Sequence, residues 1–128
     1  RQRLESGAYR RLDDEKVWVS SIHVDDLAAG LIAAWRRGMP GEVYVICDDE
    51  PTTGHEYAEL TASLLSLPLP PTIERDDIRH ELHDESFERR MISRRCSNRR
   101  MREDLGVVLT YPTIREGLPA ALRAEGVA

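Results

Sequence analysis

Two groups of side chains have the types and spacing that binding or catalysis requires, and the first is a cluster of arginines. Residues 89–102 contain seven arginines, beginning with Arg89 and Arg90, and no acidic residue. A guanidinium fork pairs well with phosphate or carboxylate oxygens, so an anionic ligand is one interpretation. Acidic residues flank the cluster, among them Glu85 and Glu88, and the pattern favours a solvated, salt-bridged surface. The cluster also lacks the aromatic side chains on which single-stranded nucleic acid stacks.

The second group is the run His80-Glu81-Leu82-His83, which contains two histidines and a glutamate. The zinc-protease helix places its histidines four residues apart so that both imidazoles reach one metal ion, whereas here the separation is three. Residues three apart still share a helical face, but this stretch is polar and we favour a solvent-facing segment over a metal site. We therefore predict no metal ligands.

The other histidines and the cysteines have ordinary structural explanations. His23 and His55 each lie beside a predicted helix start, in the region where side chains cap a helix, and His23 is also a candidate ligand contact. Cys47 ends an apolar run and is predicted to pack rather than to act as a nucleophile. Because Cys47 and Cys96 are the only cysteines, we expect no disulfide framework and a reducing, cytoplasmic compartment.

The sequence lacks the signatures of a complete active site. It contains no G-x-S-x-G elbow, no phosphate-binding G-x-x-x-x-G-K and no dinucleotide-binding G-x-G-x-x-G. A Tyr-x-x-x-Lys pair is also absent, because the residues four after the tyrosines are Asp13, Asp48, Thr61 and Arg115. We therefore predict no catalytic and no cofactor-binding residue in this chain.

Length and composition fit one ordinary domain. The chain has 128 residues, with 18 basic against 23 acidic side chains, and its net charge of −5 disfavours nonspecific binding of nucleic acid. The longest apolar candidate, residues 27–35, is too short to span a bilayer and is flanked by charge. We therefore predict no membrane segment.

Strands and helices are predicted to alternate along the chain. Residues 17–19 form an apolar strand candidate. Residues 24–37 carry apolar side chains at helical spacing, with acidic residues in the first turn and basic residues at the end. Residues 43–47 are nearly all apolar, which is typical of a strand that is buried on both faces of a sheet.

Two capping boxes predict the starts of further helices. Thr53 with Glu56, and Thr113 with Glu116, have the three-residue spacing at which a threonine and a glutamate each satisfy a backbone amide of the other residue. The first box opens a helix that we expect to reach about Leu65, and the second opens the terminal helix.

The stretch between these helices is highly charged. Residues 72–91 carry few apolar anchors and are predicted to form an exposed lid or a peripheral helix. Residues 91–93 are strand-like, and we expect Ser97 or Asn98 to cap a short helix that stops at Gly106.

Four of these segments occur in a recognisable order. They are Ser21-Ile22-His23-Val24-Asp25-Asp26-Leu27-Ala28, residues 40–51, residues 95–106 and residues 111–118. From about Val17 to Leu122, the chain resembles the C-terminal half of an extended short-chain dehydrogenase/reductase, in the NAD-dependent epimerase/dehydratase-like branch. Since the sequence opens at Arg1 rather than at a methionine, we expect it to be the later part of a longer protein.

The resemblance implies an α/β fold, the substrate-binding part of a Rossmann-type protein in which a few parallel strands pack with helices. Residues 1–128 then form one incomplete domain, with residues 72–91 as its variable lid. NAD or NADP is implied for the intact protein, whose N-terminal half carries the glycine-rich loop and a proton-transferring tyrosine-lysine pair. The chain alone is expected to bind no cofactor and to be inactive.

The resemblance also implies a set of substrate-binding residues. His23 starts a helix under the active-site cleft, and Asp48 and Asp49 start a loop at the C-terminal edge of a parallel strand, where open α/β sheets bind ligands. Arg89 and Arg90, at the end of the lid, are added as substrate-binding candidates because their guanidinium groups suit anionic oxygens. Nucleotide-sugar epimerases of this family often have an arginine four residues before the histidine, where this sequence has a valine, so a nucleotide-sugar substrate is not indicated.

Two function hypotheses of different classes follow. The first is the substrate-binding portion of an NAD(P)-dependent oxidoreductase or epimerase/dehydratase, whose partners are a small-molecule substrate and the N-terminal half. Without that half, residues 43–47 would leave unpaired amides and apolar surface, so we expect self-association or marginal stability. The alternative is a stand-alone adaptor or anion-binding module that uses the arginines of residues 89–102 against a polyanion.

Overall fold

The computed structural model describes residues 6–12 and 17–126, which adopt a small α/β fold with few strands and several helices. The strands are β1 (Arg11–Leu12), β2 (Trp18–Val19), β3 (Thr52–Thr53) and β4 (Thr72–Ile73). The helices are α2 (Val24–Arg37), α3 (Gly54–Leu64), α4 (Arg75–Glu81), α5 (Asp84–Met91), α6 (Arg99–Glu103) and α7 (Ile114–Ala124).

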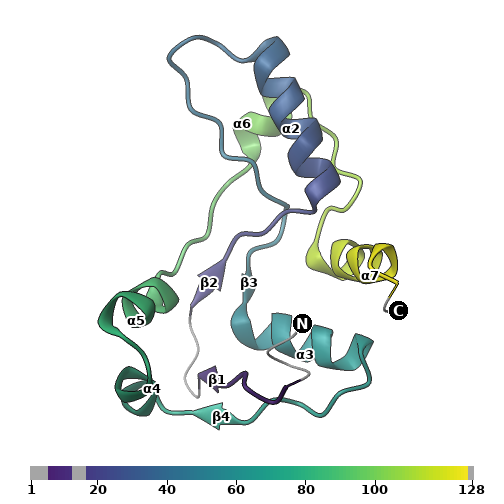
Figure 1. Ribbon diagram of the computed structural model, residues 1–128. Helices are drawn as coiled ribbons and strands as arrows, with labels where there is room; N and C mark the ends of the chain where they lie inside the picture. The colour runs from purple at the N-terminus through teal and green to yellow at the C-terminus, as the bar shows by residue number, and fades with distance from the viewer. Residues whose placement is uncertain (1–5, 13–16, 127–128) are drawn as a thin grey trace.

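The described strands form two separate pairs. β1 pairs with β4 in the parallel direction, and β2 pairs with β3 in the antiparallel direction, as Figure 1 shows. Of the strands that the sequence predicts, only residues 17–19 form one, β2, and it pairs in the antiparallel direction, so the expected direction is wrong there. The parallel pair is formed by β1 and β4, which the sequence did not predict as strands. After α2 the chain turns back, and the Asp48 N–H donates to the Ser21 carbonyl at 2.8 Å. The chain then continues into β3, which runs beside β2 in the opposite direction.

Two expected strands do not form. Residues 43–47 belong to no ladder, and Val43 and Val45 are exposed, so burial on both faces is wrong for this chain. The described part of the chain offers this segment no neighbouring strand. Residues 91–93 are not a strand either, because α5 continues to Met91. The next residues instead lie against β2, where Arg94 donates its N–H to the Trp18 carbonyl at 2.8 Å.

The helices that local chemistry indicates are confirmed. The helix expected at residues 24–37 is α2, and the Nδ1 atom of its N-cap residue, His23, accepts the Asp25 N–H at 3.2 Å. Both capping boxes are complete: Thr53 and Glu56 open α3, and Thr113 and Glu116 open α7. The turn after α6 reverses at Gly106, whose φ of +61° lies in the left-handed region.

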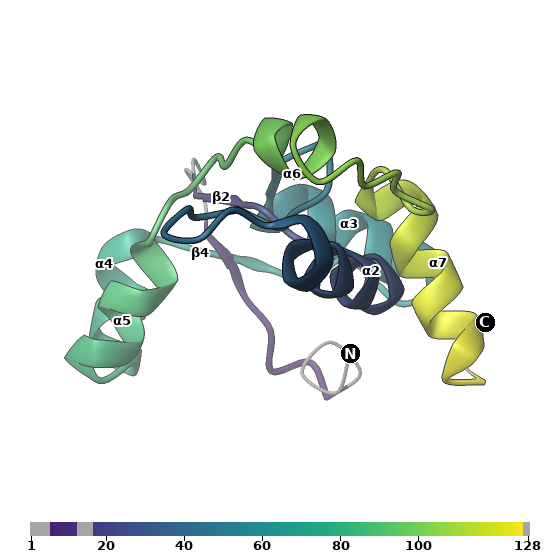
Figure 2. The ribbon, with the colours of Figure 1, turned by 90° about the horizontal axis from the view of Figure 1, so that it is seen from above.

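Two apolar clusters lie at opposite ends of the molecule, with β2 and β3 between them (Figure 1). One joins α2 to α6 and to the segment after α6, with Met101 and Leu105 fully buried. The other joins β1 to α4 and α5, the predicted lid, whose anchors Ile78 and Phe87 are buried. Viewed from above, α4 and α5 lie on one side of α2 and α7 lies on the other (Figure 2). None of the helices in the described ranges has the length and apolar character needed to cross a membrane.

Candidate functional site

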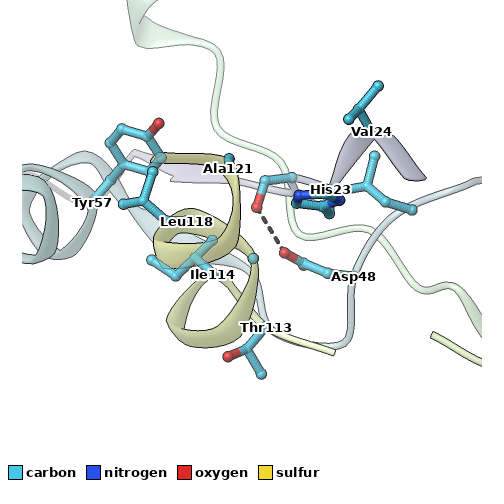
Figure 3. Close-up of a pocket in the computed structure, with 11 residues that line it drawn as sticks. His23, Val24, Asp48, Tyr57, Thr113, Ile114, Leu118 and Ala121 are labelled. Atoms are coloured by element: carbon cyan, nitrogen blue, oxygen red, sulfur yellow. Dashed lines mark hydrogen bonds between the residues drawn. The ribbon is translucent and has the colours of Figure 1, made fainter. Parts of the chain in front are cut away.

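A cavity of about 220 Å³ lies where the start of α2, the loop before β3 and the first turns of α7 meet (Figure 3). Ser21 and His23 line it from the segment before α2, and Asp48 lines it from the loop. Thr113 and Gly117 contribute from α7. The cavity therefore brings together residues that are nearly a hundred positions apart in the chain.

Tyr111 and Gly117 hold the side chain of His23 in the wall of this cavity. Its ring contacts that of Tyr111 at a tilt of 40°, with 4.0 Å between the ring centroids, and Gly117 lies against its side chain. Because Nδ1 accepts the Asp25 N–H, the neutral ring carries its hydrogen on Nε2. His23 is thus both the helix cap and the candidate ligand contact that the sequence indicates.

Asp48 is a buried carboxyl, with only 3% of its surface exposed. Ser21 donates its Oγ–H to Asp48 Oδ2 at 2.7 Å (Figure 3), whereas Oδ1 has no hydrogen-bond partner among the described residues. Burial raises the pKa of Asp48 above its ordinary value of 3.8, although the Ser21 hydrogen bond acts in the opposite direction. Burial therefore makes the charged form of this carboxyl less favourable than it is in water.

Asp49 faces away from the cavity and forms a different set of contacts. It accepts a hydrogen bond from Asn98 Nδ2 at 2.7 Å and pairs with Arg102 Nη1 at 2.5 Å. Partial burial acts to raise the pKa of Asp49, but the hydrogen bonds from Asn98 and Arg102 outweigh it and hold the pKa below its usual value. The sequence groups Asp48 and Asp49 as one substrate-binding pair. In the structure only the Asp48 side chain lines the cavity, and the pKa values of the two carboxyls shift in opposite directions.

The two neighbouring carboxyls should show opposite effects of pH on stability. A carboxyl whose pKa is higher in the folded state, as for Asp48, contributes stability that is lost as the pH rises through that folded-state pKa. A carboxyl whose pKa is lower in the folded state, as for Asp49, contributes stability that is lost as the pH falls through its folded-state pKa. As the pH rises from 2 to 7, we expect Asp48→Asn to gain stability relative to the wild type, and the matched variant Asp49→Asn to lose stability relative to it, with most of the Asp49 effect below pH 4. Urea unfolding at each pH measures both, and effects of the same sign would contradict the assignment.

Asn98 connects this loop to α6. Its Nδ2 group lies 3.1 Å from the Cys47 carbonyl, 3.1 Å from the Asp48 carbonyl and 2.7 Å from Asp49 Oδ1. Asn98 occupies the N-cap position of α6, but its side chain makes no capping hydrogen bond, so the predicted capping role of Asn98 is wrong. Ser97 takes part of that role, because its Oγ accepts the Arg99 N–H at 3.3 Å.

A second buried carboxylate fixes the other side of the cavity. Asp26, only 2% exposed, accepts the Thr110 N–H at 2.9 Å with one oxygen and the Tyr111 N–H at 2.8 Å with the other. These contacts hold Tyr111 against His23. The sequence explained Asp26 only as a first-turn acid. A better signal was its position on the same helical face as Gly30 and Ala33, the residues that α2 buries.

Arg89 and Arg90 lie away from His23 and Asp48. They line a separate cavity of about 600 Å³, together with residues of β2 and α5. Arg90 donates to the Arg10 carbonyl and lies over the Tyr9 ring, whereas Arg89 approaches Glu85 at 4.0 Å. The five residues predicted to bind substrate therefore fall into three places.

Three other arginines of residues 89–102, including Arg102 beside Asp49, are paired with acidic side chains. Arg99 pairs with Glu103 at 2.8 Å, and Arg100 pairs with Glu42 at 2.9 Å and with Asp104 at 3.1 Å. This agrees with the salt-bridged surface that the flanking acids indicate.

His80 and His83 belong to different elements, since His80 lies in the last turn of α4 and His83 precedes α5. Both are exposed. The described residues contain no group of three or more histidine, cysteine or acidic side chains arranged to hold a metal ion.

Cys47 and Cys96 should differ sharply in reactivity. Burial, followed by the influence of Cys96, Asp48 and Asp49, raises the pKa of Cys47 to about 11, and its thiol donates to the Cys96 carbonyl at 3.9 Å. Because the thiolate is the reactive form, we expect iodoacetamide at pH 8 to alkylate the partly exposed Cys96 and to spare Cys47 in the folded protein. Mass spectrometry of the peptides checks this, with the urea-unfolded protein as the control in which both react.

Comparison with known proteins gives structural relatives. No protein-family model and no curated protein matches the sequence. The solved structure of a functionally unknown conserved protein from Silicibacter pomeroyi is similar at a TM-score of 0.80 and 38% identity, over 94% of this chain and 42% of that one. The structure of gox2253 is similar at a TM-score of 0.63 and 16% identity, over 86% and 38%, which shows the fold alone. The chain thus spans less than half the length of either protein.

Proposed function

We propose that this chain is the substrate-binding portion of an NAD(P)-dependent oxidoreductase or epimerase/dehydratase similar to the extended short-chain dehydrogenase/reductases. The cavity lined by His23 and Asp48 is part of the substrate pocket, and its residues form part of the pocket wall. The cofactor and the proton-transferring residues belong to another part of the protein, so this chain is inactive by itself.

One observation carries the proposal: the four segments on which the resemblance rests converge on one place. His23 and Asp48 come from the first two segments and line the cavity with Thr113 of the fourth. Asn98 of the third segment binds the carbonyl of Asp48 from behind, and Asp49 donates its N–H to the Pro112 carbonyl at 2.8 Å. Convergence of segments so far apart in sequence is expected of a binding site and is not required by local capping chemistry.

The chemistry of the cavity suits a small ligand that carries a carbonyl or hydroxyl oxygen. His23 Nε2 is a donor in the neutral ring, and the Ser21 hydroxyl keeps lone pairs after it donates to Asp48. Apolar side chains of α7 and the ring of Tyr57 complete the wall (Figure 3). A few polar groups in a mostly apolar wall are typical of small-molecule sites.

These residues do not by themselves fit a dinucleotide. A pyrophosphate binds where a helix N-terminus presents unoccupied amides. At α2 the Asp25 N–H already bonds to His23, and two acidic residues, Asp25 and Asp26, occupy the first turn. The cofactor therefore belongs to the other part of the protein.

A hybrid protein tests the proposal. In the hybrid, this chain replaces its counterpart in the S. pomeroyi protein, so that the rest of that fold is present. We expect the hybrid to bind NADH or NADPH in a fluorescence titration and the 128-residue chain to bind neither. Tight binding by the chain alone, or no binding of either cofactor by the folded hybrid, would contradict the proposal.

The role of His23 can be tested in the same hybrid once a panel of aldehydes and ketones has identified a carbonyl substrate by NADPH oxidation. We expect His23→Ala to raise KM about tenfold, the equivalent of one lost hydrogen bond, with unchanged affinity for NADPH. An exposed acid outside the cavity provides the control, since Glu103→Ala on α6 should leave KM within about twofold. An unchanged KM for His23→Ala would remove this residue from the site.

A second candidate, the anion-binding module, is favoured by one observation: Arg89 and Arg90 share the wall of the 600 Å³ cavity. Its test is the binding of a single-stranded oligonucleotide by the 128-residue chain at increasing salt. Several arginine–phosphate contacts predict a steep loss of affinity, and an absence of binding at low salt would exclude this candidate.

A further inference from the structure

A third cavity of about 270 Å³, the middle cavity, adjoins the two cavities already described. It shares Ser21 and Tyr57 with the cavity of about 220 Å³. It shares Tyr9, Val19 and Gly54 with the cavity of about 600 Å³. In both views of the fold, β2 lies between α5, which lines the largest cavity, and α7, which lines the smallest (Figures 1 and 2). The three cavities therefore form one row.

The middle cavity suits an apolar part of a ligand. The hydroxyls in its wall already have partners: Thr52 donates to a backbone carbonyl at 3.2 Å, Thr53 belongs to the capping box of α3, and Ser21 donates to a buried carboxyl at 2.7 Å. The rest of its wall comes from Val19, Gly54 and two tyrosines, Tyr9 and Tyr57. A charged group placed there would lose its hydration without gaining a partner, whereas an apolar group would gain contacts.

Arg90 supplies a positive charge at one end of this row. Its side chain is half-buried, and its guanidinium donates to the Arg10 carbonyl and lies 5.7 Å from the centroid of the Tyr9 ring. Among the described residues no acidic side chain pairs with Arg90, whereas Arg99 and Arg100 each have such a partner. A guanidinium carries five N–H donors, and in a partly buried site it gains most from an anionic partner. The largest cavity therefore suits the anionic end of a ligand.

We infer that the three cavities hold one elongated substrate, with a carboxylate or phosphate at Arg90, an apolar segment in the middle cavity and a carbonyl or hydroxyl oxygen at His23. One molecule of this kind matches the order of the walls, which present a cation at one end, apolar surface in the middle and neutral polar groups at the other end. The inference deepens the proposed function, and it rests on that function only for the assignment of the oxygen at His23 as the reacting end.

Calorimetric titration of the 128-residue chain with ω-hydroxycarboxylates of increasing chain length tests this inference, since residues of this chain line all three cavities. We expect the affinity to rise to an optimal length and then to fall, because only one length places both ends correctly. The α,ω-diol of that length has no charge and should bind about tenfold more weakly. The matching ω-hydroxyalkyl phosphate distinguishes the anions: tighter binding than the carboxylate identifies a phosphate, and weaker binding identifies a carboxylate.

Three variants locate the binding site, with far-UV circular dichroism to confirm that each is folded. Arg90→Gln should lower the affinity for the carboxylate about tenfold and leave that for the diol unchanged. Arg99→Gln is the matched control, because Arg99 pairs with Glu103 and lines none of the three cavities. Val19→Trp fills the middle cavity from a position that is 51% exposed, and it should also lower the affinity for the carboxylate about tenfold.

The outcomes separate the substrate class from the proposed function. An absence of binding at every chain length, or equal binding of carboxylate and diol, overturns the inference. Unchanged affinity in Arg90→Gln or in Val19→Trp also overturns it, as does an equal loss in Arg99→Gln, because the binding is then not the spanning mode described. If the carboxylate binds as expected but the folded hybrid binds neither NADH nor NADPH, the substrate class is supported and the proposed function is contradicted.

Discussion

Replacement of Asp26 by alanine is expected to lower the free energy of unfolding by about 3 kcal/mol. The variant loses two hydrogen bonds to the Asp26 carboxyl, each worth roughly 1.5–3 kcal/mol, and leaves the amides of Thr110 and Tyr111 without this partner at a partly buried site. For a domain of ordinary stability this is a large fraction of the total. Urea unfolding followed by far-UV circular dichroism measures the change.

The adjacent acid provides the control for this prediction. Asp25 lies in the same helical turn and carries the same charge, but its side chain is exposed. Asp25→Ala should therefore cost less than about 1 kcal/mol, the usual effect of an acid near a helix N-terminus. Similar costs for the two variants would mean that the helix dipole, and not the buried bidentate contact, explains the role of Asp26.

The second large effect is expected for Asn98→Asp, which should cost about 2–3 kcal/mol. Aspartate has no donor for the carbonyls of Cys47 and Asp48, and it places a second carboxylate against Asp49. Loss of a donor in a partly buried site and repulsion of like charges act in the same direction. We also expect faster hydrogen exchange at the Asp49 amide, because the loop loses its tie to α6.

Arg102→Gln shows whether the charge on Asp49 alone accounts for this effect. The variant removes the exposed ion pair with Asp49 and keeps the three contacts of Asn98. Exposed ion pairs contribute roughly 0–1 kcal/mol, so we expect a small change in stability. If Arg102→Gln destabilised the protein as much as Asn98→Asp, the importance assigned to Asn98 would be wrong.

Local chemistry in the sequence predicts the helices well. α2, α3 and α7 begin where capping residues indicate, because a cap depends on atoms within three residues of the helix start. Asn98 shows the limit of such reasoning. It has the residue type and position of a cap, but acceptors some fifty positions away in sequence outcompete the local amides for its side chain.

Strand pairing is less predictable from this sequence, since it depends on neighbours that only the fold supplies. Residues 43–47 have the apolar character of a buried strand but find no partner in the described chain. The relative direction of the strands is mispredicted for a similar reason. β2 and β3 are antiparallel because the chain turns back after α2, and no single residue in the sequence indicates that reversal.

The candidate site was predicted in part. His23 and Asp48 share a cavity as the resemblance implies, whereas Asp49, Arg89 and Arg90 lie elsewhere. Sequence order could not separate Asp48 from Asp49, because adjacent residues of an extended loop point to opposite sides. Whether these side chains bind a substrate stays a prediction.

The bidentate contact of Asp26 also has a consequence for synthesis on the ribosome. Its two partners follow it by 84 and 85 positions, so a growing polypeptide presents the first turn of α2 long before either amide has left the exit tunnel. During that interval the carboxylate stays in water and the turn has no anchor. Anchoring of this turn therefore waits until residues 110 and 111 have emerged, and translation products truncated before them should be proteolysed rapidly.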